Sequence, residues 1–105
     1  MKTPNLNYIK EISGGDENFE IEMVKVLKQE FPKEKEIYHA NIKNNNKKAT
    51  AEIVHKIKHK FSILDMKESH KIAMDYEENL REESYELQTE FEEALDIVSS
   101  YITTI

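Results

Sequence analysis

Apolar residues recur every three or four positions along most of the chain, the spacing that places them on one face of an α-helix. The most informative stripe comprises Val54, Ile57, Phe61 and Leu64, at offsets of three, four and three. It predicts an amphipathic helix from about Lys47 to Leu64. A second regular stripe predicts the last helix, and it consists of Leu87, Phe91, Ala94, Leu95, Val98 and Ile102.

Two further helices are predicted before Lys47. Thr3-Pro4-Asn5 opens a short helix, whose apolar contacts are Leu6, Ile9 and Ile12. Ser13-Gly14-Gly15-Asp16 ends it, because glycine adopts the left-handed conformation that terminates helices and Asp16 is a good N-cap for the next one. The stripe of this next helix contains Phe19, Met23, Val26 or Leu27, Phe31, Ile37, Tyr38 and Ile42. Pro32 lacks a backbone N–H, so a kink or break is predicted near Phe31.

The connections between these segments are short. Asn44-Asn45-Asn46 predicts a turn, Asp65-Met66 is a brief link, and a boundary falls between Glu82 and Tyr85. A further helix is predicted from Lys67 to about Glu83, between the Asp65-Met66 link and this boundary. Its inner face carries Ile72, Ala73, Tyr76 and Leu80. Short links force neighbouring helices to run antiparallel. We therefore predict an all-α fold, an up-down antiparallel four-helix bundle with a short extra N-terminal helix, as one domain spanning residues 1–105.

Composition agrees with this fold class and narrows the function. Charged residues make up 34% of the 105 residues and hydrophobic residues 38%, with only two Gly and two Pro, which favours long helices. The sequence has no Cys, which excludes disulfides and thiolate metal sites. It has no apolar run near the roughly 18 residues of a membrane span and no signal-peptide core. We expect a soluble cytoplasmic protein.

Charge is distributed unevenly along the chain. The formal net charge is −6, yet residues 47–60 contain five Lys and one Glu, a net of +4. Residues 75–96 contain ten acids and one Arg, a net of −9. The overall acidity argues against binding to nucleic acid or to an anionic membrane. The basic segment surrounds His55 and suits an acidic partner surface.

His55 is the strongest candidate for chemistry. At about 100° per residue, it points roughly 140° away from the apolar stripe of its helix, into solvent. Lys58 and His59 follow one turn later and Ser62 two turns later, on or beside the same outward face. An exposed imidazole beside an ammonium group is suited to carrying an anionic group.

Four short sequences, in this order, resemble a known family. They are Gly14-Gly15-Asp16 followed by Phe19, Phe31-Pro32, His55-Lys56-Ile57-Lys58, and Tyr76-Glu77-Glu78-Asn79-Leu80-Arg81. Between about Asn5 and Glu83 the chain resembles the histidine-containing phosphotransfer (HPt) domain of multistep phosphorelays. Two positions differ from that family: His59 stands where a Gly is common one turn after the histidine, and Asp65 replaces the Gly that usually follows this helix.

The resemblance implies a four-helix bundle whose exposed histidine accepts a phosphoryl group from an aspartyl phosphate of a receiver domain and passes it to another receiver. It implies that His55 is the phosphoacceptor and that Lys58 stabilises the phosphoryl group. The neighbouring residues expected to contact the receiver are Glu52, Lys56, His59 and Ser62. The receiver would supply the aspartate and Mg²⁺, so the chain itself would be a phosphocarrier with no cofactor, not an enzyme. We expect a monomer, because the last helix should complete the bundle within one chain.

The residues around His55 fit this chemistry. An exposed histidine, with an ordinary pKa near 6.5, offers a neutral ring nitrogen as nucleophile. Lys58 at i+3 can pair with the phosphoryl oxygens, and Lys56 and Lys60 are expected to add a weaker, salt-screened field. Exposed pairs of this kind contribute only about 0.5–1 kcal/mol each, which suits a carrier that must release its group.

Two other interpretations remain open from the sequence. The first is a helical adaptor, a degenerate HPt domain that docks on a receiver without exchanging phosphate; His59 and Asp65 favour it. The second is a carboxylate–histidine metal protein, because Glu-x-x-His spacings occur at Glu36–His39 and Glu52–His55. In such proteins both ligands point into the bundle, whereas Glu52 lies almost opposite the apolar stripe.

Overall fold

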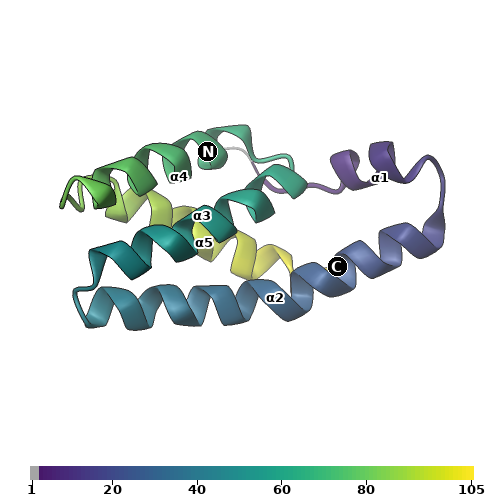
Figure 1. Ribbon diagram of the computed structural model, residues 1–105. Coiled ribbons are helices and arrows are strands. Elements are labelled where there is room, and N and C mark those ends of the chain that lie inside the picture. Colours follow the sequence, from purple (N-terminus) through teal and green to yellow (C-terminus); the bar gives the residue numbers. More distant parts are fainter. Residues whose placement is uncertain (1–2) are drawn as a thin grey trace.

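A computed structural model describes residues 3–105, and these residues form helices and no strand, which confirms the all-α class (Figure 1). The helices are α1 (Asn7–Ser13), α2 (Glu17–Lys43), α3 (Lys47–Ile63), α4 (Lys67–Arg81) and α5 (Gln88–Tyr101). None of them, within the described part of the chain, has both the length and the apolar character needed to cross a membrane.

The helix boundaries depend on the turn residues that the sequence predicted. Gly14 ends α1 in the left-handed conformation, with φ of 61°. The side chain of Asp16 then accepts a hydrogen bond from the backbone N–H of Phe19, at 3.2 Å, and caps α2. Asn46 caps α3 in the same way, accepting from the N–H of Ala49 at 3.1 Å. These caps fix where α2 and α3 begin.

The segment before α1 is held against the end of α3. Asp65, with φ of 58°, adopts the left-handed conformation in the link between α3 and α4. The backbone N–H of Asn5 donates to the carbonyl oxygen of Leu64 at 3.0 Å, and the Asn5 side-chain amide donates to Asp65 at 3.4 Å. The segment before α1 is therefore bound to the α3–α4 link, and α1 itself lies at the end of the molecule, beside the N-terminal part of α2 (Figure 1).

Of the kink or break predicted near Phe31, the break is wrong, because α2 continues through Pro32 and is 27 residues long. The fixed φ of proline matches helical geometry, so Pro32 forfeits one backbone hydrogen bond without ending the helix. The fully buried Phe31 side chain anchors α2 at this point. Tertiary packing thus outweighs the local cost of the proline.

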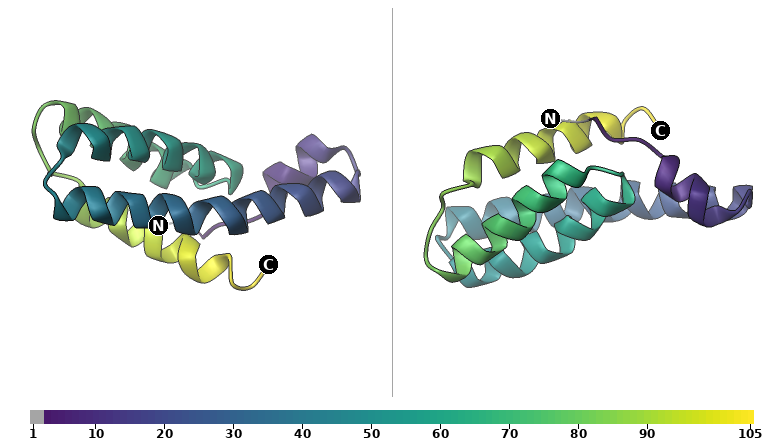
Figure 2. Two further views of the ribbon diagram at one scale, coloured as in Figure 1. Left: turned by 60° about the horizontal axis from the view of Figure 1, so that its bottom comes forward. Right: turned by 90° about the horizontal axis from the view of Figure 1, so that it is seen from above.

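Some residues of the predicted apolar stripes lie at the surface. Ile12, Phe19 and Ile37 are 46%, 37% and 50% exposed. The N-terminal part of α2 runs past the ends of α3 and α4, where α1 is the helix that packs against it (Figures 1 and 2). Ile12 and Phe19 lie in this region, so their exposure follows from the shortage of helices to cover them.

Helices α2 to α5 share one core. Within it, the ring of Phe91 on α5 lies 5.1 Å from both Tyr38 on α2 and Tyr76 on α4, and 5.8 Å from Phe61 on α3. Helix α3 packs against α2 and α4, and α5 packs against α4 and α2 (Figure 2). The chain is therefore a helical bundle with an aromatic centre.

Candidate functional site

His55 lies at the surface of α3, in the position that the helical spacing predicts. Val54, Ile57 and Phe61 are fully buried, which fixes the inner face of the helix. The His55 side chain is 51% exposed. Its ring is accessible to a partner while the backbone beneath it is held by the core.

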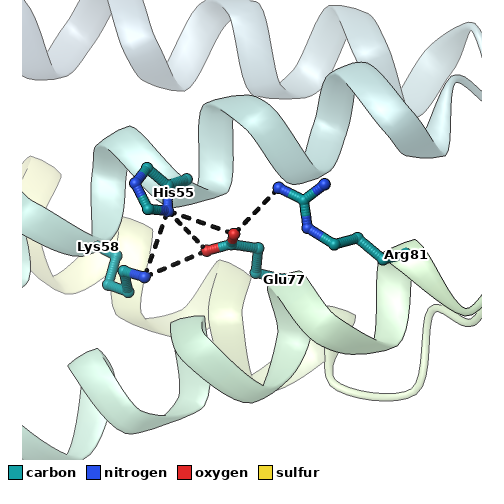
Figure 3. A network of polar contacts seen from close by, with 4 residues as sticks. All are labelled: His55, Lys58, Glu77 and Arg81. Carbon is teal, nitrogen blue, oxygen red and sulfur yellow. Dashed lines mark hydrogen bonds and ion pairs between the residues drawn. The ribbon is translucent and has the colours of Figure 1, made fainter.

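A carboxylate from the neighbouring helix contacts the ring (Figure 3). The Nδ1 atom of His55 lies 3.1 and 3.2 Å from the two carboxylate oxygens of Glu77 on α4. The Nζ atom of Lys58 lies 3.2 Å from Glu77 Oε1 and 3.3 Å from His55 Nδ1. Arg81 donates from Nη2 to Glu77 Oε2 at 3.1 Å. Three nitrogen-bearing side chains thus converge on one carboxylate.

These contacts favour one tautomer of the neutral ring. An ionised carboxylate only accepts hydrogen bonds, so a bond between Glu77 and Nδ1 requires the proton to be on Nδ1. Lys58 then donates to Glu77 and not to the ring. The other ring nitrogen, Nε2, carries the lone pair and makes no hydrogen bond with residues 3–105. Glu77 therefore fixes the orientation of the ring and leaves its nucleophilic nitrogen without a hydrogen-bond partner among the described residues.

Glu77 is ionised at neutral pH despite its partial burial. Its side chain is only 14% exposed, and burial acts to raise its pKa. The hydrogen bonds from Arg81, His55 and Lys58 have the opposite effect and together hold the pKa of Glu77 below its ordinary value. The negative charge beside Nδ1 is accordingly maintained over the neutral range.

Glu77 was not among the site residues that the sequence predicted. It does lie within the Tyr76–Arg81 run that carries the family resemblance, and its i+4 spacing to Arg81 is visible in the sequence. However, helical periodicity places Glu77 next to the buried Tyr76 without indicating that this edge of α4 faces His55. Only the packing of α4 against α3 supplies that contact.

The predicted partner-binding residues divide into two groups. His59 is brought next to His55, with the ring centroids 5.1 Å apart and an edge-on orientation. Glu52, Lys56 and Ser62 are exposed on the same helix but form no hydrogen bond with the His55 ring. They surround the site without entering it.

The prediction that Lys60 adds to the field at His55 is wrong. Lys60 is 8% exposed and faces α2, where its Nζ lies 2.9 Å from Glu30 Oε1 and 3.2 Å from Glu34 Oε2. Burial acts to lower the pKa of Lys60, but the two carboxylates outweigh this effect and raise it. Five residues along a helix from His55, the side chain points about 140° away from it, toward α2.

A polar hollow lies beside the ring. It is lined by Lys58, Met74, Glu77, Glu78 and Arg81. Met74 is 45% exposed and places an apolar side chain next to the charged groups of the hollow. This hollow extends the site from α3 onto α4.

The alternative metal ligands are not gathered into a site. Glu36 and His39 lie exposed on α2, and Glu52 and His55 lie exposed on α3. Throughout residues 3–105, no group of three or more His, Asp or Glu side chains is arranged to hold a metal ion.

Comparison of the chain with protein-family models, with curated proteins and with solved structures gives no match.

Proposed function

We propose that this protein is a phosphorelay intermediate in which His55 accepts a phosphoryl group from an aspartyl phosphate of a receiver domain and passes it to another receiver. The observation that supports it best is the arrangement of the exposed ring: Glu77 holds Nδ1 at 3.1 Å and Nε2 is left free. The resemblance to HPt domains supports the same role, with the bundle as an up-down four-helix scaffold that presents the ring.

In the transfer step, one bond forms on His55 and one bond breaks on the receiver. The Nε2 lone pair attacks the phosphorus atom, an N–P bond forms, and the P–O bond to the receiver's aspartate breaks, so that a carboxylate leaves. The proton on Nδ1 stays in place. The ring becomes more positive as the N–P bond forms, and the Glu77 carboxylate stabilises that charge through its hydrogen bond. Glu77 also supports the reverse transfer, since it keeps the proton that makes the ring a good leaving group.

Lys58 has two alternative anionic partners. In the unphosphorylated protein it pairs with Glu77 at 3.2 Å. A phosphoryl group on Nε2 brings close to two negative charges to the site, and Lys58 can then pair with its oxygens. Arg81 remains with Glu77 and keeps that carboxylate in place. The exchange of partners limits how tightly the phosphoryl group is held, as a carrier requires.

The reacting aspartate and Mg²⁺ belong to the receiver in this proposal, so the protein acts as a phosphocarrier and not as an enzyme. We propose that it works as a cytoplasmic monomer. The receiver would dock around His55, in contact with Glu52, Lys56, His59 and Ser62 and with the exposed Met74.

A phosphotransfer assay tests the proposal. A panel of phosphorylated receiver domains is incubated with the wild-type protein, His55→Gln and the matched control His39→Gln, and the label on the protein is measured. We expect label on the wild type and on His39→Gln, with the acid lability and alkali stability of phosphohistidine, and none on His55→Gln. Label that persists in His55→Gln would contradict the proposal.

A second candidate function is a helical adaptor that docks on a receiver without exchanging phosphate. The observation in its favour is the His59 ring, which packs edge-on against His55 where the family commonly has Gly. Receiver binding with no transfer to wild-type protein, but with transfer to His59→Gly, would assign this function and attribute the block to the His59 side chain.

A further inference from the structure

His55 and His59 form an exposed pair of imidazoles on one face of α3. They are four residues apart, so they lie one above the other on the helix surface. Two histidines at this spacing on a helix are a recurrent way of binding zinc. In the proposed transfer His59 contributes only to receiver docking and takes no part in the chemical step, so its ring is available for a second role.

The distance between the two rings suits a shared metal ion. Zn–N bonds of about 2.0–2.1 Å and a near-tetrahedral angle place the centroids of two imidazoles on one ion roughly 5 Å apart. The observed centroid distance is 5.1 Å. The rings are edge-on, with an interplanar angle of 87°. His59 is exposed, so its ring can turn its nitrogen toward the ion without displacing a core residue.

The hydrogen bond between Glu77 and His55 is of the kind that commonly orients a histidine that binds a metal ion. Histidines that bind metal commonly donate their other ring N–H to a carboxylate, which fixes the tautomer and makes the binding nitrogen more basic. The Nδ1 atom of His55 is 3.1 Å from Glu77, and Nε2 is the nitrogen left for the ion. The same feature that prepares Nε2 for phosphorus prepares it for a metal.

The charges nearby decide which cations can bind. Lys58 and Arg81 are both paired with Glu77, and Lys56 is exposed on the same helix. The carboxylate that contacts the ring, Glu77, is thus already paired with two cationic groups, which disfavours cations that depend on carboxylate oxygen ligands, such as Mg²⁺ and Ca²⁺. Cations that form strong bonds to imidazole nitrogen, such as Cu²⁺ and Zn²⁺, are favoured instead.

We infer that His55 and His59 together bind a divalent transition-metal cation, with water in its remaining positions, and that the bound ion occupies Nε2 and blocks phosphorylation of His55. The binding part stands on the ring geometry alone, and the blocking part rests on the proposed function. Phosphoryl transfer would then respond to the supply of free transition metal.

Binding is tested first, without any receiver. Cu²⁺ and Zn²⁺ are titrated into the wild-type protein, His59→Gln, His55→Gln and the control His39→Gln, with calorimetry for both ions and electron paramagnetic resonance for Cu²⁺. We expect one ion per chain in the wild type and in His39→Gln, loss of this binding in both site variants, and about tenfold weaker binding in Glu77→Gln. Circular dichroism checks that every variant remains helical. Binding that is absent from the wild type, or unchanged in His59→Gln, would overturn the inference.

Blocking is tested with a receiver that transfers to the wild-type protein, in the presence of excess Mg²⁺. Because His59 also lies in the proposed docking surface, the rate of each protein is compared with its own rate without Zn²⁺. Zn²⁺ should slow transfer to the wild type on this scale and not transfer to His59→Gln, and a chelator should restore the wild-type rate. Because both proteins meet the same receiver and the same Zn²⁺, equal slowing of the two would overturn the blocking role. Failure of transfer in every condition would remove the proposed function while leaving the binding result intact.

Discussion

At the scale of single residues, Glu77 gives the candidate site its form. One carboxylate accepts from His55, Lys58 and Arg81, and its side chain is largely shielded by α3 and α4. Charge-assisted hydrogen bonds of this kind are stronger than neutral ones. Glu77 therefore both orients the reacting ring and links two helices at the surface.

The hydrogen bonds that Glu77 accepts make a contribution to the free energy of unfolding that depends on pH. The pKa of Glu77 is lowered in the folded protein from the ordinary value of 4.5. Its contribution is thus fully present above about pH 4.5 and is lost as the pH falls through the lower, folded-state value. We expect Glu77→Gln to lower the free energy of unfolding by about 1 kcal/mol at pH 7 and by clearly less near pH 3.

Urea denaturation across this pH range provides the measurement. Glu78→Gln on the exposed side of the same helix is the matched control and should show little difference at any pH. A difference between wild type and Glu77→Gln that stays constant from pH 7 to pH 3 would contradict the role assigned to the ionised carboxylate.

At the scale of the helices, Lys60 joins α3 to α2. Its ammonium group is nearly buried between Glu30 and Glu34, and the other oxygen of Glu34, Oε1, is buried without a hydrogen-bond partner among the described residues. Removal of the ammonium would leave Glu34 with a poorly solvated charge. Such a loss costs more than the loss of an exposed ion pair.

Replacement of Lys60 by Met keeps the length of the side chain and removes the charge. We expect Lys60→Met to lower the free energy of unfolding by about 2 kcal/mol. Lys56→Met, an exposed site four residues earlier on the same helix, should change it by less than about 0.5 kcal/mol. Equal effects in urea denaturation would show that the link between α2 and α3 contributes nothing specific.

The helices also show which features the sequence can predict. The helix end at Gly14 and the cap at Asp16 were predicted because each depends on a single residue and its immediate neighbours. Asn46 was predicted only as part of a turn, and the structure shows that it also caps α3. The continuity of α2 through Pro32 was not, since the burial of Phe31 against other helices outweighs a local rule. The direction of Lys60 was missed because the charge run was treated as one patch without assigning each lysine a face.

At the scale of the whole molecule, the site depends on how the helices are arranged. His55 and Lys58 belong to one helix and were both predicted from its periodicity. Glu77 is 22 residues after His55, and its place depends on the rotation of α4 about its axis. That rotation is set by the core, where Tyr76, the residue just before Glu77, is fully buried. Sequence periodicity predicts the buried and the exposed face of α4. It does not predict which residue at the border between these faces contacts the neighbouring helix.

Buried hydroxyl groups connect this core across three helices. The hydroxyl groups of Tyr38 on α2 and Tyr76 on α4 lie 2.9 Å apart, and Tyr38 also donates to Glu92 on α5 at 2.9 Å. Burial raises the pKa of Tyr76 to about 12 and also raises that of Tyr38, so both hydroxyl groups stay protonated over the physiological range. The three side chains thus form one hydrogen-bonded chain inside an aromatic cluster.

A double-mutant cycle measures whether this chain acts as a unit. Tyr38→Phe leaves both Tyr76 and Glu92 without their partner, so we expect it to lower the free energy of unfolding by about 2 kcal/mol. Tyr76→Phe removes one bond and should cost about 1 kcal/mol. The double variant should cost less than the sum, by about 0.5–1 kcal/mol, because the bond between the two hydroxyl groups can be lost only once. Urea denaturation at pH 7 provides the values. Strict additivity would mean that the two hydroxyl groups stabilise the protein independently, and that the rotation of α4 is set by the aromatic rings alone.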